Sequence, residues 1–265
     1  MKIKYLIQIS LIVLITLIGC NETKTVTEPE EAPDYSKEIS EFFPANIGDS
    51  YTYSVDTLNQ ETGKFYTIGS RKVEVNKVEN NADKNLYLCN EDYTIFGKNI
   101  LTNSKFQITP TTLEFIADTN GVSALIPDSI EIEIKLMLDE SFKLVEFPLT
   151  KNKEWKVFQG SANFGTFKFN IFDVKGEYIE SEVLKTNTLG KEFNTEKFKY
   201  TININIPDIA NPFLSNIQKY EAYVWFAPGF GVVKIEGSRI FVDPITGNGF
   251  DIADTNRIIR HTLTE

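Results

Sequence analysis

The chain has 265 residues, of which 37 are acidic and 27 are basic, and its formal net charge at pH 7 is −10. An acidic surface repels the phosphate backbone of nucleic acids, so we expect no nucleic-acid partner. Two cysteines, Cys20 and Cys89, and one histidine, His261, are present. These are too few for a disulfide framework or a multi-histidine metal site, so we expect no metal and no cofactor.

Residues 1–20 have the organisation of a bacterial lipoprotein signal. Lys2 and Lys4 make the start of the chain positive, residues 5–18 are mostly apolar, and Leu17-Ile18-Gly19 leads directly to Cys20. The apolar run is shorter than the roughly 20 residues that a membrane-spanning helix needs. We therefore predict that residues 1–19 are removed and that lipid attached to the Cys20 thiol anchors the chain to a membrane.

Residues 20–41 are predicted to form a disordered acidic tether. They are mostly polar, contain Pro29 and Pro33, and offer few apolar side chains to bury. The composition changes at Phe42-Phe43-Pro44, so we expect the folded part to begin at residue 42.

Strict alternation of apolar and polar residues dominates the rest of the chain. In residues 198–206, for example, Phe198, Tyr200 and Ile202 interleave with Lys199 and Thr201. This period of two is typical of strands with one buried face. Similar patterns predict strands at residues 51–55, 73–75, 130–138, 167–171, 232–242 and 258–263, and turns at residues 80–83, 228–231 and 244–249.

Helical periodicity is scarce in this sequence. The best place for a short helix is residues 208–220, although Pro212 inside this segment disfavours a helix. Residues with a high strand propensity, such as isoleucine, valine, tyrosine and phenylalanine, are plentiful. We therefore predict an all-β fold of antiparallel strands with little helix.

A weak internal repeat links the two halves of the chain. The matched landmarks, each separated by 104 residues, are Phe43-Pro44 with Phe147-Pro148, Tyr51 with Trp155, and Phe65 with Phe169. Three landmarks at one spacing suggest an ancient duplication. The duplication predicts two similar β units, residues 42–142 and residues 143–265, either packed side by side or continuous as one long sheet.

Neither Cys89 nor His261 has the sequence surroundings of a catalytic residue. Cys89 follows the apolar run Leu86-Tyr87-Leu88, which predicts a buried and inert thiol in a strand. His261 lies beside Arg260 near the end of the chain, and we expect it to be a solvated strand residue. No Gly-x-Ser-x-Gly motif supplies a nucleophile that His261 could activate.

The acidic residues show no catalytic or calcium-binding pattern. Glu131 and Glu133 point the same way on one predicted strand, as expected for a charged outer face. Asp251, Asp254 and Asn256 form an oxygen-rich cluster, but their spacing departs from the helix-loop-helix calcium pattern and a turn accounts for it. We therefore assign no catalytic residue, no metal ligand and no ligand-binding residue.

Two motifs at the ends of the predicted folded region resemble the TapB-like group of bacterial envelope proteins. The first is Phe43-Pro44 with Gly48 and Tyr51, which matches an opening aromatic-Pro-x3-Gly signature. The second and more specific one is the run YVWFAPGFGVVK at residues 223–234, which matches a closing aromatic-Ala-Pro-Gly-x-Gly hairpin. The chain departs from the group at Tyr51, where tryptophan is commoner, and its middle carries no match.

The resemblance implies a curved antiparallel sheet, similar to the half-barrels of lipoprotein-carrier proteins. The concave face of such a sheet can hold a hydrophobic ligand or a covering element. The resemblance brings no catalytic residues. Within the hairpin, Tyr223, Val224, Trp225 and Phe226 are expected to alternate between the two faces of a strand and to serve its packing.

The first functional hypothesis is a non-enzymatic lipoprotein of the bacterial cell envelope that is anchored to the membrane through Cys20. Its β body would bind an apolar ligand, a glycan or another envelope protein. One alternative is a polysaccharide hydrolase that uses two carboxylates. A third hypothesis is a structural accessory of an outer-membrane assembly.

Overall fold

The computed structural model describes residues 33–43, 45–81, 84–116, 134–164, 167–186, 190–207, 215–250 and 254–265. All of these belong to one compact unit, Pro33–Glu265. The signal segment, Cys20 and residues 20–32 of the predicted tether lie outside the described residues. Within the described ranges, neither helix has the length and apolar character required to cross a membrane.

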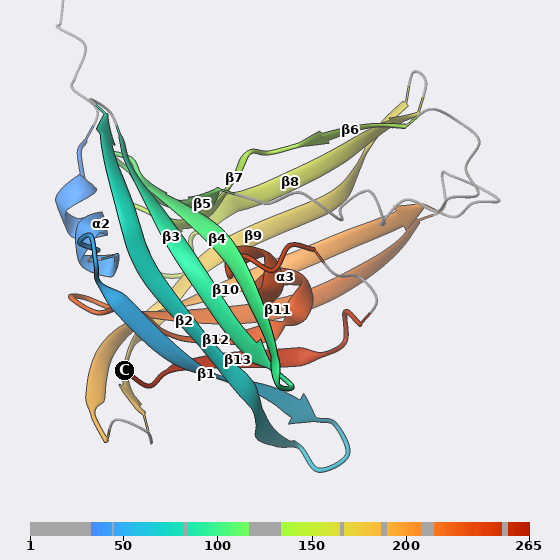
Figure 1. The fold of residues 1–265 in the computed structure, drawn as a ribbon. Coiled ribbons are helices and arrows are strands. Elements are labelled where there is room, and N and C mark those ends of the chain that lie inside the picture. Colours follow the sequence, from blue (N-terminus) through green and yellow to red (C-terminus); the bar gives the residue numbers. More distant parts are fainter. Residues whose placement is uncertain are drawn as a thin grey trace, which may run out of the picture. The chain divides into compact units, whose positions relative to one another are not determined.

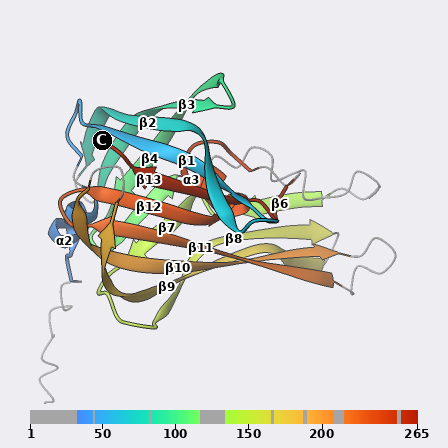
Figure 2. The ribbon, with the colours of Figure 1, turned by 90° about the horizontal axis from the view of Figure 1, so that it is seen from below.

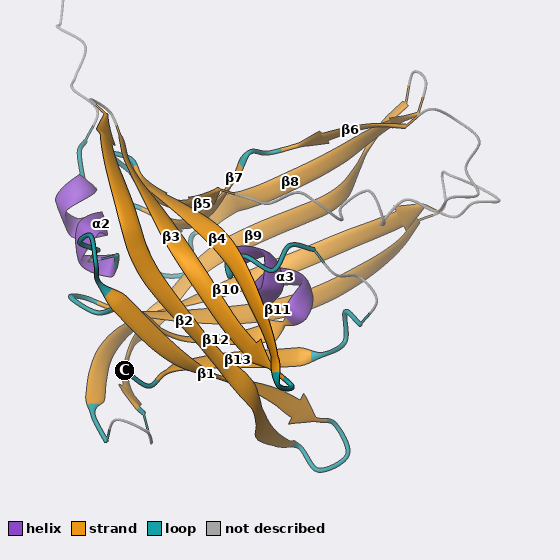
Figure 3. Cartoon of the chain, in the orientation of Figure 1, coloured by secondary structure: helices purple, strands orange, loops and turns teal. Residues whose placement is uncertain are grey.

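Thirteen strands form one antiparallel sheet, which confirms the predicted all-β class. Figures 1 and 3 show that this sheet is curved and that the two helices are short. The strands follow the spatial order β6-β8-β9-β10-β11-β12-β13-β1-β2-β3-β4-β5-β7. In chain order they are β1 (Ser50–Asn59), β2 (Lys64–Asn81), β3 (Lys84–Ile95), β4 (Lys98–Ile108), β5 (Thr112–Ile116), β6 (Ile134–Leu138), β7 (Ser141–Glu146), β8 (Glu154–Phe164), β9 (Phe167–Lys185), β10 (Glu192–Pro207), β11 (Ser215–Ala227), β12 (Gly231–Ser238) and β13 (Ile258–Leu263).

The sheet curves round but does not close. Its edge strands, β6 and β7, follow each other in the chain, and no backbone ladder joins them within the described residues. Strands β1 and β13 pair near the middle of the order, with Tyr53 opposite Leu263, so the first and last strands of the chain are neighbours. Bulges, such as the one between Val55 and Asp56 in β1, increase the bending of the strands.

Side-chain hydrogen bonds connect β7 to strands that stand in the other half of the strand order. The Trp155 indole N–H of β8 donates to the carbonyl oxygen of Lys143 at 2.9 Å, and the Tyr200 hydroxyl of β10 donates to that of Leu144 at 2.6 Å. Gly176 makes room for the indole, because a Cβ at this position would lie 2.4 Å from Cζ2 of Trp155. These bonds satisfy β7 carbonyl groups that a closed sheet would pair through a ladder.

Helix α2 (Ser36–Phe42) lies where the sequence predicted part of the tether. Ile39 and Phe42 are buried and lie three residues apart, so they share one face of the helix. Phe42 makes edge-on contacts with Phe147 and Phe198, at ring-centroid distances of 5.6 and 6.3 Å. The compact unit therefore begins at Pro33 and not at residue 42, because an aromatic surface is available to bury these two apolar side chains.

Helix α3 (Arg239–Ile245) corrects the strand that was predicted over residues 232–242. Strand β12 ends at Ser238, whose hydroxyl oxygen accepts a hydrogen bond from the backbone N–H of Ile240 at 3.4 Å and so caps the helix. Residues 240–245 are all buried. An apolar run that is buried on every side lacks helical periodicity, which explains why the sequence pattern was misleading.

Two further predictions, a strand and a helix, are tested only in part because some of their residues lie outside the described ranges. Strand β6 covers only residues 134–138 of the strand predicted at residues 130–138, and the remainder lies outside the described residues. The helix predicted at residues 208–220 is wrong over residues 215–220, which form part of β11 because they pair with β10. Residues 208–214 lie outside the described residues. The duplication into two β units stays a prediction, although all described strands join one sheet.

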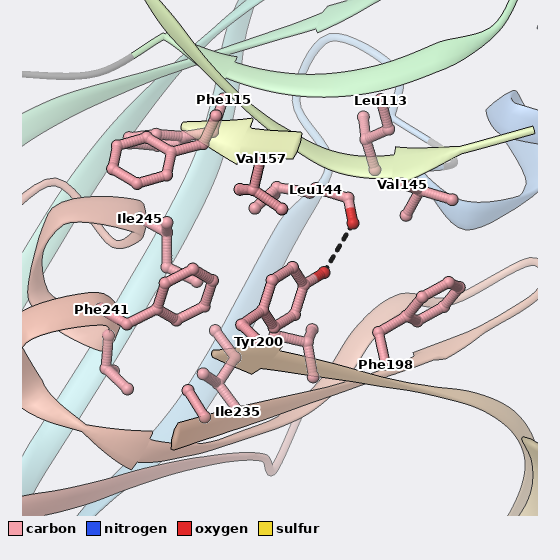
Figure 4. Close-up of a cluster of buried hydrophobic side chains, with 14 of the residues drawn as sticks. Leu113, Phe115, Leu144, Val145, Val157, Phe198, Tyr200, Ile235, Phe241 and Ile245 are labelled. Carbon is pink, nitrogen blue, oxygen red and sulfur yellow. Dashed lines mark hydrogen bonds between the residues drawn. The ribbon is translucent and has the colours of Figure 1, made fainter. Parts of the chain in front are cut away.

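Aromatic side chains fill the space between α3 and the strands (Figure 4). Tyr200 stacks on Phe241 of α3 with 4.5 Å between ring centroids, while its hydroxyl points to Leu144. Phe142 of β7 stacks on Phe158 of β8 at 4.2 Å. Ring contacts of this kind add to the free energy gained from burying apolar area. The core therefore joins β7, β8, β10 and α3 across the curve of the sheet.

We expect Phe241→Ala to lower the free energy of unfolding by about 3–5 kcal/mol, because Phe241 is fully buried and its removal leaves a cavity beside Tyr200. Phe96→Ala makes the same chemical change at a side chain that is 60% exposed, and should lower the free energy of unfolding by less than about 1 kcal/mol. Urea denaturation followed by tryptophan fluorescence measures both variants. Equal losses would show that α3 does not belong to the cooperative core.

Candidate functional site

The concave side of the sheet was the expected place for a hydrophobic ligand, and its occupant is α3. Figure 2 gives a second view of the helix within the curve of the strands. An apolar cavity of about 40 Å³ remains, lined by Phe43, Phe226 and Ile245 among others. Pockets for drug-sized ligands have volumes of roughly 300–1,000 Å³. The resemblance implied that either a hydrophobic ligand or a covering element occupies this face, and the structure shows a covering element, helix α3.

A charged pair lies among the apolar side chains of the interior. The Arg71 guanidinium of β2 donates to both carboxylate oxygens of Glu91 in β3, from Nε to Oε2 at 2.7 Å and from Nη2 to Oε1 at 2.9 Å. The Ser104 hydroxyl of β4 also donates to Oε1 of Glu91, at 2.5 Å. The rings of Tyr53 and Tyr93 flank the guanidinium at 5.2 and 5.9 Å. Each of the polar side chains Arg71, Glu91 and Ser104 therefore has a hydrogen-bond partner inside the protein.

This charged pair was not predicted, although the alternation of the two strands contains a signal for it. Arg71 falls in register with Val73 on the inward face of β2, and Glu91 falls in register with Cys89 on the inward face of β3. Burial works against the charged form of Arg71, but the attraction of Glu91 outweighs it and raises the pKa of Arg71. The Arg71 guanidinium therefore keeps its charge, and its contact with Glu91 serves the structure of the interior.

His261 is buried, so the prediction of a solvated residue is wrong. The side chain lies on the inward face of β13 between Ile259 and Leu263, and the residue is 1% exposed. Its ring meets Tyr93 edge-on at 6.2 Å, and its Nδ1 has no hydrogen-bond partner in the described ranges. Burial, and then the charge of Arg71, hold the pKa of His261 well below its usual value. The imidazole is therefore neutral at pH 7.

Cys89 confirms the prediction of a buried thiol. It is a free cysteine on β3 and is 1% exposed. Burial, followed by the nearby charge of Glu91, raises the pKa of the Cys89 thiol to about 12. Because the thiolate is the reactive form, this side chain is inert at neutral pH.

The carboxylates of the candidate acidic residues, and that of the buried Asp243, are either engaged or outside the described residues. Asp243 of α3 lies 2.8 Å from Nη2 of Arg239, one helical turn away. Asp254 lies 3.4 Å from Nε of Arg257 in the turn before β13. Outside the described residues lie Glu131, Glu133 and Asp251. Within the described ranges, no group of three or more histidine, cysteine, aspartate or glutamate side chains is placed to hold a metal ion.

The hairpin between β11 and β12 has the predicted turn and the predicted alternation. Gly229 and Gly231 adopt φ angles of +80° and +79°, which other residues rarely adopt. Val224 and Phe226 line the interior cavity. Trp225 lies on the opposite face, where the ammonium group of Lys234 sits 4.3 Å from its ring centroid. The aromatic residues of this motif therefore serve packing on both sides of the strand.

Two hollows lie on the outer side of the sheet, which is the face opposite to the core. One has a volume of about 440 Å³ and is lined by side chains of β2, β3 and β4, including Lys72, Asp92 and Asn103. The other has a volume of about 190 Å³ and lies over β1, β12 and β13. Space for a ligand is therefore larger on the outer side than in the concave interior.

Comparison with known proteins gives weak structural likenesses. No family model and no curated protein sequence matches the chain. Among solved structures, it is similar to an exported protein with a YmcC-like fold from Bacteroides fragilis (16% identity, 84% of this chain and 97% of the other, TM-score 0.48). A lipoprotein from Parabacteroides distasonis (15% identity, 84% and 97%, TM-score 0.49) and the hypothetical lipoprotein YmcC from Escherichia coli (8%, 86% and 94%, TM-score 0.31) are also similar. None of these three descriptions names the TapB-like group, so that resemblance stays a prediction.

We expect Glu91→Ala to lower the free energy of unfolding by about 3–5 kcal/mol, because it leaves the buried Arg71 charge without a partner. The double variant Arg71→Met with Glu91→Leu should recover most of this loss, since it removes both charges and keeps apolar volume. Glu79→Ala breaks the exposed pair with Lys77 and should cost less than about 1 kcal/mol. Chemical denaturation of the four proteins tests the expectation, and a double variant as unstable as Glu91→Ala would contradict it.

We also expect His261 to lower the stability of the protein as the pH falls below about 6.5. The folded state keeps this imidazole neutral, whereas the unfolded chain protonates it below a pKa of about 6.5. The unfolded state then binds more protons, so the free energy of unfolding should decrease by up to about 1.4 kcal/mol per pH unit as the pH falls. In His261→Gln the slope between pH 7 and pH 5 should be shallower, because the contribution of the imidazole is removed. An identical slope in the two proteins would rule out this residue as the cause.

Proposed function

We propose that this chain is a lipid-anchored protein of the bacterial cell envelope that acts as a non-enzymatic binding or interaction module. The anchor is Cys20, at the end of the signal formed by the basic start, the apolar run and Leu17-Ile18-Gly19. Recognition takes place on the outer side of the sheet. This part of the proposal rests on the observation that α3 and aromatic side chains occupy the concave side, which leaves the outer side for recognition.

The filled interior argues against an apolar ligand and in favour of a polar partner, either a glycan or another envelope protein. A cavity of about 40 Å³ has no room for an acyl chain. The hollows of the outer side, in contrast, are lined mainly by charged, amide and hydroxyl side chains. Hydrogen-bonding groups of this kind suit sugars and polar protein surfaces.

The same geometry supports a role without catalysis. The buried acidic residues of the described ranges, Asp56, Glu91 and Asp243, are each held by an arginine. The one histidine is buried and neutral, and Cys89 is buried and protonated. A hydrolase that works with two carboxylates needs a free pair facing its substrate. The proposal therefore assigns no catalytic residue.

The anchoring is tested by labelling bacteria that express the full chain with an alkyne analogue of a fatty acid. The unmodified chain should take up the label and sediment with membranes, because the acyl chains insert into the bilayer. Cys20→Ser should lose the label and leave the membrane fraction. Cys89→Ala is the matched control, since it removes the buried cysteine and should keep both label and membrane association.

Two results would contradict the proposed anchoring. One is a labelled Cys20→Ser protein, and the other is an unlabelled Cys20→Ser protein that still sediments with membranes as the unmodified chain does.

A further inference from the structure

Two turns at one end of the sheet each present an exposed apolar side chain. Ile47 lies in the turn before β1 and is 67% exposed, and Phe230 lies in the turn between β11 and β12 and is 47% exposed. Strands β1 and β12 both pair antiparallel with β13, so they run in the same direction and begin at the same end of the sheet. The two side chains therefore belong to one end, here named the α2 rim.

Helix α2 lies at this rim. The backbone N–H of Gly229 donates to the carbonyl oxygen of Glu41 in α2 at 2.8 Å, which joins the helix to the turn of Phe230. Figure 1 shows α2 and the start of β1 on the left of the view, and the turn between β1 and β2 at the lower right. The compact unit begins at Pro33, shortly before α2. The α2 rim is therefore the end of this unit that the predicted tether enters.

Contacts within the protein hold both apolar side chains in position. The N–H of Gly48, the residue after Ile47, donates to the carbonyl oxygen of Val75 at 2.8 Å. The ring of Phe230 meets that of Phe193 edge-on, with 5.1 Å between ring centroids. Turns ordinarily favour glycine, proline, asparagine, aspartate and serine. Apolar side chains held out on ordered turns lose little conformational freedom when they bind, so they suit contact with an apolar partner.

Neither turn carries a basic side chain. Residues 45–49 and 228–231 include one charged residue, Asp49, whose carboxylate accepts a hydrogen bond from the backbone N–H of Asn46 at 2.7 Å. The formal net charge of the whole chain is −10. A strongly anionic surface would repel such a protein. The partner that fits the α2 rim is therefore apolar and carries little net charge.

We propose that the α2 rim rests on the lipid bilayer that holds the anchor, with Ile47 and Phe230 inserted at the boundary between headgroups and acyl chains. This inference rests on the proposed anchor at Cys20. An extended chain spans at most about 3.6 Å per residue, so residues 20–32 keep Pro33 within roughly 45 Å of the point of lipid attachment.

The tether makes this contact possible with only two side chains. Apolar groups gain free energy when they leave water for the bilayer interface. Because the anchor already holds the protein at the membrane, the contact is intramolecular and takes place at a high effective concentration. Two inserted side chains then orient the β body, whereas the acyl chains retain it.

The opposite end of the sheet offers a matched comparison. Phe96 and Leu101, at the hairpin of β3 and β4, are 60% and 79% exposed. Strand β3 runs in the same direction as β1, because both pair antiparallel with β2, so the turn after β3 lies at the end opposite to the α2 rim. Contact of the α2 rim with the membrane directs this turn away from the bilayer. Apolar exposure is thus similar at both ends, and the tether distinguishes them.

Quenching by nitroxide-labelled lipid tests the proposed orientation. The lipidated full chain is reconstituted in phosphatidylcholine vesicles, with a nitrobenzoxadiazole fluorophore on a cysteine introduced by Glu41→Cys or by Lys98→Cys, both at exposed positions. Cys20 carries lipid and Cys89 is buried, so only the introduced thiol reacts. The nitroxide should quench the reporter at position 41 at least about threefold more strongly than the one at position 98, because only the α2 rim touches the bilayer.

Serine variants separate insertion from mere proximity. Ile47→Ser combined with Phe230→Ser should lower quenching at position 41 at least about twofold, because both inserted side chains are lost. Phe96→Ser combined with Leu101→Ser is the matched control, since it removes two exposed apolar side chains from the opposite end and should leave this quenching unchanged. A thermal melt of each variant confirms that it is folded.

Three results would contradict the proposed contact. The first is equal quenching of the two reporters, and the second is unchanged quenching in the folded variant that lacks both Ile47 and Phe230. The third is stronger quenching at position 41 when phosphatidylglycerol is added to the vesicles, because that result would indicate an electrostatic contact with anionic headgroups.

The anchor and the orientation fail separately. Cys20→Ser with an N-terminal histidine tag can be held on vesicles by nickel-chelating lipid, and it should show the same difference between the two reporters. If fatty-acid labelling fails while the tagged protein keeps this difference, the anchor alone is overturned. If the chain is lipidated and both reporters are quenched alike, the orientation alone is overturned.

Discussion

Covering the inward face of an unclosed sheet is the constraint on which this structure depends. A curved sheet of thirteen strands has a long apolar face, and its edge strands β6 and β7 do not pair to seal it. Helix α3 supplies the missing surface from within, with residues 240–245 all buried. Trp155 and Tyr200 bind the backbone of β7 from the opposite wall. The interior is thus filled by the chain itself, which leaves little room for a ligand.

The polar groups of the interior fit the same constraint. A buried charge is tolerated when it is paired and hydrogen-bonded, and Arg71 and Glu91 meet that condition with the help of Ser104. His261 is accommodated in its neutral form, because burial and the Arg71 charge both disfavour protonation. These groups tie β2, β3, β4 and β13 to one arrangement. His261 and Cys89 are each 1% exposed, so neither side chain is accessible to solvent.

Because α3 fills the interior, the larger hollows lie on the outer side of the sheet. On that side, residues of neighbouring strands lie opposite one another in register and form cross-strand rows, such as Lys234, Thr262 and Ser54. The β9–β10 hairpin adds a wall to one such row and turns a flat surface into a hollow.

Much of the fold could be predicted from the sequence, because alternation with a period of two is a local property. Rows such as Phe198, Tyr200 and Ile202 identify strands and their buried face without any knowledge of their partners. The pattern behind the predicted lipoprotein signal is equally local, since it depends only on adjacent residues. Local patterns failed at α3 and at His261. An apolar run carries no periodicity when it is buried on all sides, and a polar residue shows its burial only through its partners.

The sequence by itself determined the all-β class, the alternation of inner and outer residues along each strand, and the buried state of Cys89. Only the tertiary structure decided that the concave side is covered by α3, that Arg71 meets Glu91, and that Thr186 closes a hollow over Ser54 and Thr262. The physical reason is that these contacts join strands that are distant in the chain. Such contacts depend on the strand order and curvature of the sheet, and neither of these properties is written in the sequence of one strand.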